Sequence, residues 1–393
     1  MFFMLPRVGG AGLGGNQNAL QARSGFSETV RLGGIGEIQE NDAVVMRVKL
    51  DKPLDPGSLY FRGIALDTFD NLSWSRPLAR IKEPFVRGDR DTIQVDNASS
   101  RDSLSIQTIY LEPLNTPYLF ALPRAVVVQS GFSHLSKDVY GAISFPQTFD
   151  RISYKVLSDR STPPTTRLQS DFKPYSTDDI NYLQLPEIMN SRIAELAEDV
   201  TARASNRYDK AKALETYLKS TYGYTLQRKA SGREPLADFL FNVREGHCEY
   251  FATAMAVMLR TQGIATRIVN GFHGGEFNDA AGVTIVRERN AHSWVEVYFP
   301  GEDAWVSFDP TPAADIGMSS AESGFAGTIR KYAEALETFW IQYFVAFDDQ
   351  EQQSLARSMR SGMAELQVAG AVYLGIAKDM IGDWWASVRG ADG

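Results

Sequence analysis

The chain has 393 residues, of which 44% are hydrophobic and 22% are charged, and these values are typical of a folded protein rather than a disordered one. Its 40 basic and 48 acidic residues give a net charge of −8, which excludes the strongly basic character of a nucleic-acid-binding protein. A single cysteine excludes an intramolecular disulfide and a zinc site built on several thiolates.

The first half of the chain predicts a leader, a β-rich domain and a linker. Residues 1–40 are expected to be a flexible leader, because their glycine-rich stretch is not followed by the Gly-Lys-Ser/Thr of a phosphate-binding loop. Residues 41–160 predict a β-rich domain, and residues 161–175, which begin Ser-Thr-Pro-Pro-Thr-Thr, predict a linker. The predicted strands are β-branched or aromatic runs bounded by Gly, Pro, Asn and Asp, at 44–50, 59–69, 104–111, 125–129 and 152–157.

The next predicted domain, residues 176–318, contains the single cysteine of the chain, Cys248, and the pattern places it at the start of a helix. Hydrophobic residues recur at helical spacing over 251–259, and Cys248 falls on the same face in the first turn. The free N–H groups and partial positive charge of a helix N-terminus favour a thiolate and can hold an oxyanion. Gly246 permits a sharp turn that would expose the sulfur. This pattern predicts Cys248 as a nucleophile.

A predicted β-hairpin then brings a histidine and a carboxylate together. Residues 291–299 and 304–309 alternate as strands around the turn Pro-Gly-Glu-Asp. In an antiparallel pair, the residue numbers of two facing residues always add to the same sum. A turn with an even number of residues, such as this one, makes that sum odd. The numbers of His292 and Asp309 also have an odd sum, so both are expected on one face as direct or near-diagonal neighbours unless a bulge intervenes. Asp309 would then orient His292, the general base.

These segments carry a family resemblance. Residues 235–312 resemble the transglutaminase-like superfamily, a branch of the papain-like cysteine enzymes, in three motifs: Gly246-His247-Cys248-Glu249-Tyr250-Phe251-Ala252, Asn290-Ala291-His292-Ser293-Trp294-Val295-Glu296-Val297 and Trp305-Val306-Ser307-Phe308-Asp309-Pro310-Thr311-Pro312. Four further segments, at 24–27, 59–63, 66–70 and 235–241, resemble the extracytoplasmic part of bacterial TgpA-like membrane transglutaminases.

The resemblance implies an α+β fold. We expect a papain-like catalytic domain whose cysteine helix packs on an antiparallel sheet, preceded by the β-rich domain and followed by a helical segment at 319–393. It also implies acyl transfer on protein carboxamides, of the protein-glutamine gamma-glutamyltransferase type, through a Cys248 thioester. A cysteine protease or amidase that uses the same triad, and a non-catalytic envelope scaffold, are the alternatives. The expected partners are a glutamine donor and an amine acceptor in protein or peptide substrates, without nucleic acid or cofactor.

The expected location also comes from the resemblance. TgpA-like proteins carry membrane helices before and after this region, whereas a membrane span needs about 20 apolar residues, and none is found in this sequence. We therefore expect a soluble part of a membrane-anchored parent, on the periplasmic face of a bacterial inner membrane.

Four further residues are candidate substrate-groove or oxyanion neighbours: His247, Glu249, Trp294 and Tyr224. For Trp294 and Tyr224 the alternative is core packing, and for Glu249 it is a helix cap or salt bridge. A metal site built from His247, Cys248, His273 and His292 is disfavoured, because adjacent ligands fit poorly and no helical or finger spacing is present. No metal is expected to take part in the chemistry.

Overall fold

The computed structural model describes residues 29–33, 39, 41–76, 83–86, 92–100, 102–114, 116–132, 134–146, 148, 150–227, 230, 234–312 and 325–341. Most of the predicted leader (1–40) and most of the predicted C-terminal segment (319–393) lie outside these residues.

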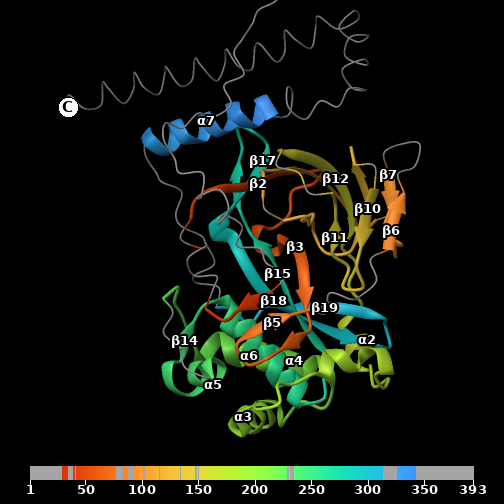
Figure 1. The fold of residues 1–393 in the computed structure, drawn as a ribbon, viewed down its shortest axis with the longest axis vertical. Coiled ribbons are helices and arrows are strands. Elements are labelled where there is room, and N and C mark those ends of the chain that lie inside the picture. The colour runs from red at the N-terminus through yellow and green to blue at the C-terminus, as the bar shows by residue number, and fades with distance from the viewer. Residues whose placement is uncertain are drawn as a thin grey trace, which may run out of the picture. The chain divides into compact units, whose positions relative to one another are not determined.

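Two larger antiparallel sheets organise the described chain (Figure 1). The seven-stranded sheet has the order β16 (Glu276–Asn278), β17 (Val283–Arg287), β2 (Val44–Leu50), β8 (Leu104–Leu111), β12 (Ile152–Asp159), β9 (Ala125–Ser130) and β7 (Thr92–Gln94). The four-stranded sheet has the order β19 (Ala304–Phe308), β18 (Ala291–Phe299), β15 (Thr266–His273) and β3 (Tyr60–Leu66). Buried and more exposed residues alternate in β8 and β9, as in a sheet that buries one face, whereas β15, β17 and β18 are buried on both faces.

Shorter strands complete the β structure. They form β1 (Val30–Arg31) with β5 (Ser73–Ser75) and β4 (Thr68–Phe69), β11 (Ile143–Ser144) with β10 (His134–Lys137) and β6 (Glu83–Val86), and β13 (Gly223–Tyr224) parallel to β14 (Glu245–Gly246). The β13–β14 pair matters for the site, because it places Tyr224 beside the residues that lead into the cysteine helix.

The two sheets exchange strands across the predicted boundary between the β-rich and catalytic domains. The strand β3, from the first half, pairs with β15, and β17, from the second half, pairs with β2. A buried ion cluster holds β3 in place: Glu296 of β18 accepts from Arg62 at 3.1 Å and from Arg267 at 2.6 Å. Burial raises the pKa of Glu296, but the two guanidinium groups outweigh it and hold the pKa at about 2.

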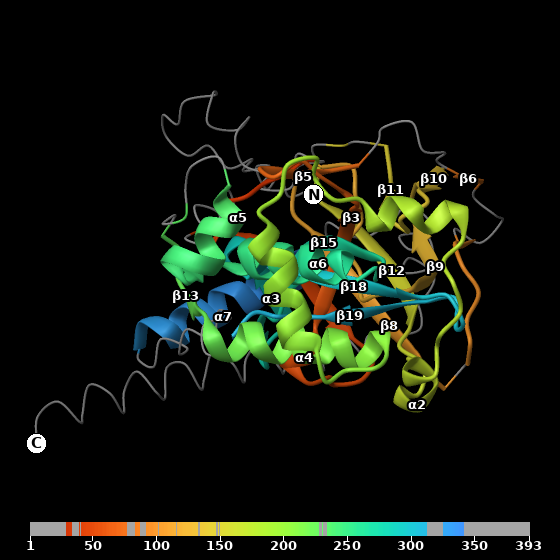
Figure 2. The same cartoon turned by 90° about the horizontal axis from the view of Figure 1, so that it is seen from below.

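Helices cover the four-stranded sheet on one side (Figure 2). They are α3 (Ser191–Thr201), α4 (Arg207–Thr221), α5 (Pro235–Asp238) and α6 (Cys248–Thr261), with a π-turn at Phe239–Val243. The helix α6 contacts β15 and β18 on one side and α3, α4 and α5 on the other. Every residue from Cys248 to Arg260 is buried, so α6 is a central helix rather than the one-sided helix that its spacing suggested.

The remaining described helices are short, apart from one near the C-terminal end of the described residues. They are α2 (Thr165–Gln169), which falls in the predicted linker, α7 (Phe325–Trp340), and 3-10 turns at Pro56–Ser58, Thr177–Leu183 and Glu288–Asn290. Two carboxylates of α7 pair with arginines of the large sheet, Glu337 with Arg47 and Glu334 with Arg287. Among the described residues, no helix is long and apolar enough to cross a bilayer.

The predicted fold class is confirmed. A β-rich N-terminal part precedes a core in which helices pack on antiparallel sheets, and the helix that begins at Cys248 contacts the sheet that carries His292.

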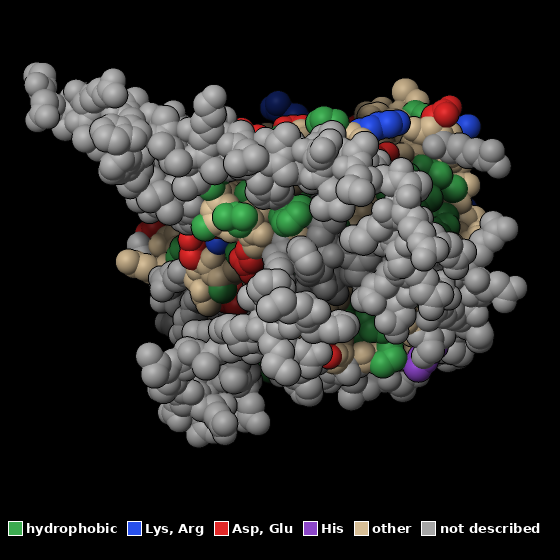
Figure 3. All heavy atoms as spheres, turned by 90° about the horizontal axis from the view of Figure 1, so that it is seen from above, with side chains coloured by type: hydrophobic (Ala, Val, Ile, Leu, Met, Phe, Trp, Pro, Cys, Tyr) green, Lys and Arg blue, Asp and Glu red, His purple; other side chains and the backbone are tan. Residues whose placement is uncertain are grey.

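On the face drawn in Figure 3, the described side chains mix hydrophobic, acidic and basic groups.

Candidate active site

The N-terminus of α6 positions Cys248. His247 is the N-cap residue, and its carbonyl accepts from the N–H of Tyr250 at 2.9 Å and of Phe251 at 3.4 Å. Space around Gly246 is tight, since an added Cβ would lie 3.1 Å from the ring of Tyr250 and 3.2 Å from that of Phe239, so these rings would have to shift by a few tenths of an ångström. The expectation that this turn exposes the sulfur is wrong: Cys248 is 0% exposed, and it packs within an apolar cluster.

His292 and Asp309 meet beside Cys248. The register of β18 and β19 pairs Val295 with Phe308, which places Asp309, one residue past β19, diagonally across from His292. Nε2 of His292 lies 2.8 Å from Oδ2 of Asp309, and both side chains are buried. Because Nε2 faces the carboxylate, Nδ1 is the ring nitrogen left for the thiol of Cys248.

The electrostatics favour an imidazolium–carboxylate pair. Burial lowers the pKa of His292, but the charge and hydrogen bond of Asp309, together with the contact to Cys248, outweigh burial and raise it to about 10. Burial raises the pKa of Asp309, but the charge and hydrogen bond of His292 and the N–H of Thr311 hold it well below its usual range. A protonated His292 is the state that stabilises a thiolate and delivers a proton to a leaving group.

Tyr60 and His273 belong to this site, although the motifs did not nominate them for a role in the chemistry. The hydroxyl of Tyr60, on β3, donates to Oδ2 of Asp309 at 2.8 Å. The rings of Tyr60 and His273 stack with centroids 4.0 Å apart, and Nε2 of His273 donates to the carbonyl of Gly57 at 3.1 Å. Burial and the neighbouring charge of His292 lower the pKa of His273 to about 4, so it is neutral at physiological pH.

His247, Glu249 and Trp294, which the sequence predicted as neighbours of the site, make different contacts. His247 is fully buried, with Nδ1 3.8 Å from Glu249, whose Oε2 also accepts from the N–H of Gly33 at 3.1 Å. Trp294 is fully buried, and its indole meets the ring of Tyr60 edge-on with centroids 5.2 Å apart. For Trp294, this burial favours packing between sheet and site over a role as an exposed groove wall.

Tyr224 faces a residue of the predicted leader. Its hydroxyl donates at 2.8 Å to Oε1 of Gln39, and Nε2 of Gln39 lies 3.7 Å from Sγ of Cys248. Packing in the core, the alternative expected for Tyr224, therefore does not account for its hydroxyl group, which hydrogen-bonds beside Cys248.

Among the residues that the structure describes, one group of side chains could offer ligands to a metal ion. Ligand atoms of His273, His292 and Asp309 lie within 4.8 Å of one another. His292 and Asp309 already hydrogen-bond each other, so a cation here would have to break the bond that orients the imidazole.

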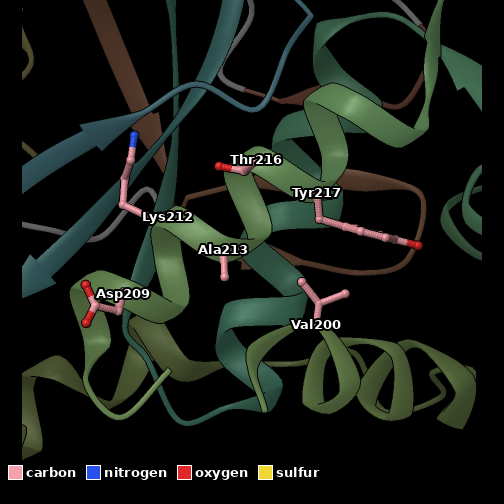
Figure 4. A pocket seen from close by; sticks show the side chains of 6 residues that line it. All are labelled: Val200, Asp209, Lys212, Ala213, Thr216 and Tyr217. Atoms are coloured by element: carbon pink, nitrogen blue, oxygen red, sulfur yellow. The ribbon is translucent and has the colours of Figure 1, made fainter. Parts of the chain in front are cut away.

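A separate, open pocket lies on the helical side (Figure 4). It has a volume of about 550 Å³ and is lined by Val200, Asp209, Lys212, Ala213, Thr216 and Tyr217, of α3 and α4. None of these residues belongs to the Cys248–His292–Asp309 group.

Comparison with known families agrees with this geometry. Residues 1–165 match the family model of the TgpA N-terminal domain, and residues 194–310 match that of the transglutaminase-like superfamily. The chain joins a TgpA N-terminal domain to a transglutaminase-like core. Cys248, His292 and Asp309 all lie within that core.

Individual relatives fit the same assignment. The chain is 30% identical, over 355 residues, to a protein-glutamine gamma-glutamyltransferase of Pseudomonas aeruginosa, a match that covers 85% of this chain and 48% of that protein. It is 37% identical, over 208 residues, to the uncharacterized protein YebA of Bacillus subtilis, covering 50% of this chain and 27% of YebA. The chain therefore spans about half, or less, of the length of these relatives.

A solved structure shares the fold of the TgpA N-terminal domain and transglutaminase-like core. The crystal structure of the periplasmic domain of TgpA from Pseudomonas aeruginosa matches with a TM-score of 0.59 and 27% identity, covering 73% of this chain and 94% of that one.

Proposed function

We propose that this chain catalyses acyl transfer from glutamine carboxamides of proteins, through a thioester on Cys248. The observation that carries the proposal is the buried contact of His292 with Asp309 next to a cysteine at the N-terminus of a helix. The relationship to a named glutamyltransferase supports the choice of glutamine as the donor.

In the first half-reaction, the thiolate of Cys248 attacks the carboxamide carbon of the donor. The negative charge that develops on the oxygen is held by N–H groups at the start of α6. His292, protonated at Nδ1, gives that proton to the departing nitrogen, which leaves as ammonia. Asp309 holds the imidazole in place from its other side, at Nε2.

In the second half-reaction, an amine attacks the thioester. His292, now neutral, takes the proton of the attacking amine, and Cys248 leaves as a thiolate. The product is an amide between the donor and the amine. Water in place of the amine would give glutamate, which is the hydrolytic alternative with the same residues.

For the parent protein, we propose a membrane-anchored enzyme that acts on the periplasmic side. The support is the likeness to a periplasmic domain and the match to relatives about twice the length of this chain.

The experiment supplies the chain with a glutamine-containing peptide and a labelled primary amine, and follows ammonia and labelled product together. We expect stoichiometric release of ammonia with labelled peptide. Cys248→Ala should lose both while keeping the melting temperature near that of the parent chain. His292→Ala should also lose both, but at a lower melting temperature, because it leaves the buried carboxylate of Asp309 without its partner. His134→Ala, at an exposed histidine of β10, is the matched control and should retain activity.

The products separate the alternatives. Ammonia with glutamate and no labelled peptide would identify an amidase, and cleaved peptide without ammonia a protease. Neither product, with a folded chain, would leave the non-catalytic scaffold.

A further inference from the structure

A glutamine of this chain lies against its own catalytic cysteine. Gln39 makes three contacts with the site: Oε1 accepts from the hydroxyl of Tyr224 at 2.8 Å, Nε2 donates to the carbonyl of Ala291 at 2.6 Å, and Nε2 lies 3.7 Å from Sγ of Cys248. Ala291 precedes His292 on β18, and Tyr224 lies on β13. The carboxamide is therefore held by residues from two elements that flank the sulfur.

The orientation of this carboxamide is fixed by its partners. The carbonyl of Ala291 can only accept, so the group 2.6 Å from it is the amide nitrogen and not the oxygen. The amide oxygen then faces the hydroxyl of Tyr224, which donates to it. A carboxylate in the same place would put an oxygen against the carbonyl of Ala291, so these contacts select an amide over an acid.

The described residues on both sides of Gln39 are tied to the structure that surrounds the site. On one side, Gly33 donates to Glu249, the residue after Cys248, at 3.1 Å. On the other side, the carbonyl of Asn41 accepts from the N–H of Arg289 at 2.9 Å, just before β18. Gly33 is thus attached to the first turn of α6, and Asn41 to a residue just before β18.

We propose that Gln39 occupies the carboxamide subsite in cis, as a built-in competitor of external glutamine, and that Tyr224 and Ala291 are the residues that recognise the donor carboxamide. The inference rests on the proposed function for the identity of the competing ligand. It assigns Tyr224 to the oxygen that becomes the oxyanion, and it accounts for the complete burial of Cys248 in a site that must admit a substrate.

The effect of Gln39 on the alkylation rate and on the KM for donor peptide can be estimated. A side chain tethered a few residues from fixed points has an effective concentration in the millimolar range. If its intrinsic dissociation constant is about one tenth of that, the site is open about one tenth of the time, and apparent rates fall about tenfold. Removing the Gln39 amide should therefore accelerate the alkylation of Cys248 and lower the KM for donor peptide, each by about tenfold.

The test measures alkylation of the full chain by iodoacetamide, read as intact mass, because Cys248 is its only thiol. The variants are Gln39→Ala, Gln39→Glu and, as matched control, Gln129→Ala at an exposed glutamine of β9. We expect both changes at position 39 to accelerate alkylation about tenfold at an unchanged melting temperature, and Gln129→Ala to have no effect. Unfolding would also expose the thiol, so a control is needed. If the site is open but folded, a glutamine-containing peptide should slow alkylation of Gln39→Ala in a saturable manner.

The outcomes separate this inference from the proposed function. Faster alkylation of both variants with peptide protection, but without acyl transfer by any form, would uphold occupancy by Gln39 and sink the proposed chemistry. Acyl transfer with alkylation and KM unchanged in Gln39→Ala would overturn the inference and leave the chemistry standing. Acceleration in Gln39→Ala but not in Gln39→Glu would overturn amide recognition, because bulk alone would then shield the sulfur.

Discussion

The hydroxyl of Tyr60 donates to the same oxygen of Asp309 that faces Nε2 of His292. Oδ1 of Asp309 accepts from the N–H of Thr311 at 3.0 Å, so both oxygens of this buried carboxylate have donors. Tyr60 comes from β3, about 250 positions before Asp309, and β3 joins the four-stranded sheet through its pairing with β15. The TgpA N-terminal domain therefore supplies a residue that orients the proposed catalytic carboxylate.

Tyr60→Phe should lower kcat about tenfold with little change in KM. A hydrogen bond to a charged group contributes about 1.5–3 kcal/mol, and about 1.4 kcal/mol corresponds to a factor of ten in rate. Tyr298→Phe is the matched control, because its hydroxyl also donates to a carboxylate at 2.8 Å, that of the exposed Asp303. Equal rates for Tyr60→Phe and the parent chain would show that Asp309 is held without the phenol.

Asp309→Asn should keep the fold and lose about 10² or more in turnover. An amide fills the same space but does not stabilise the imidazolium, and it can donate to His292 and select the wrong tautomer. In a serine protease the corresponding change costs about 10⁴, but a thiolate can form before substrate arrives, so a smaller loss is expected here. Steady-state kinetics and iodoacetamide labelling near neutral pH would measure it. Near-normal turnover would mean that another group orients His292.

The ion pair of His292 and Asp309 makes the stability of the fold depend on pH. Because the pKa of folded His292 is raised from 6.5 to about 10, its stabilisation is complete below about pH 6.5 and is lost as the pH rises towards 10. Because the pKa of folded Asp309 is lowered, its stabilisation is present above about pH 4 and is lost as the pH falls.

Urea unfolding of the parent chain and of Asp309→Asn would measure this dependence. The difference in unfolding free energy should be largest between about pH 4 and 6.5 and should shrink towards pH 10. Asp303→Asn, at the exposed partner of Tyr298, should show no comparable change. A difference that grows with alkaline pH would contradict the assigned protonation states.

Local patterns carried much of the fold and of the candidate site. The alternation at 291–299 and 304–309 defined β18 and β19 almost to the residue, because hydrophobic period and turn length together fix the register of a hairpin. Strand parity then required His292 and Asp309 on one face, and the two side chains do meet. The helical spacing after Cys248 likewise placed the start of α6.

Contacts between distant segments were beyond such patterns. No local signal shows that β3 pairs within the four-stranded sheet rather than with the β-rich part, so Tyr60 could not be nominated, although the segment 59–63 stood out by resemblance. Gln39 was assigned to a leader by composition, and its contact with Cys248 joins positions 209 residues apart in the sequence. The burial of the thiol likewise involves distant segments, since Cys248 belongs to an apolar cluster that includes Val45 and Phe61.

Addition of a chelator should leave activity unchanged. The described group that could hold a cation, His273, His292 and Asp309, includes the bond that orients His292, and a bound ion would compete with that bond. Ammonia release with and without EDTA would test this, with readdition of individual divalent ions as the control. Activity lost to EDTA and restored by one particular ion would contradict it.

Gly271→Ala should disturb the site by pushing β3 away from β15. Gly271 lies where the register of these strands shifts, and a Cβ there would stand 2.0 Å from the carbonyl oxygen of Phe61, the residue after Tyr60. A backbone atom cannot move aside as a flexible side chain can, so we expect a loss of about 3 kcal/mol in unfolding free energy and a fall in kcat beyond that of Tyr60→Phe. Gly263→Ala is the matched control. Gly263 has φ +69° but open space around its Cβ position, so that change should cost only about 1 kcal/mol of stability and spare activity. Denaturant unfolding and steady-state kinetics on both variants would decide, and equal stability losses with unchanged kcat would show that the close approach of β3 does not position Tyr60.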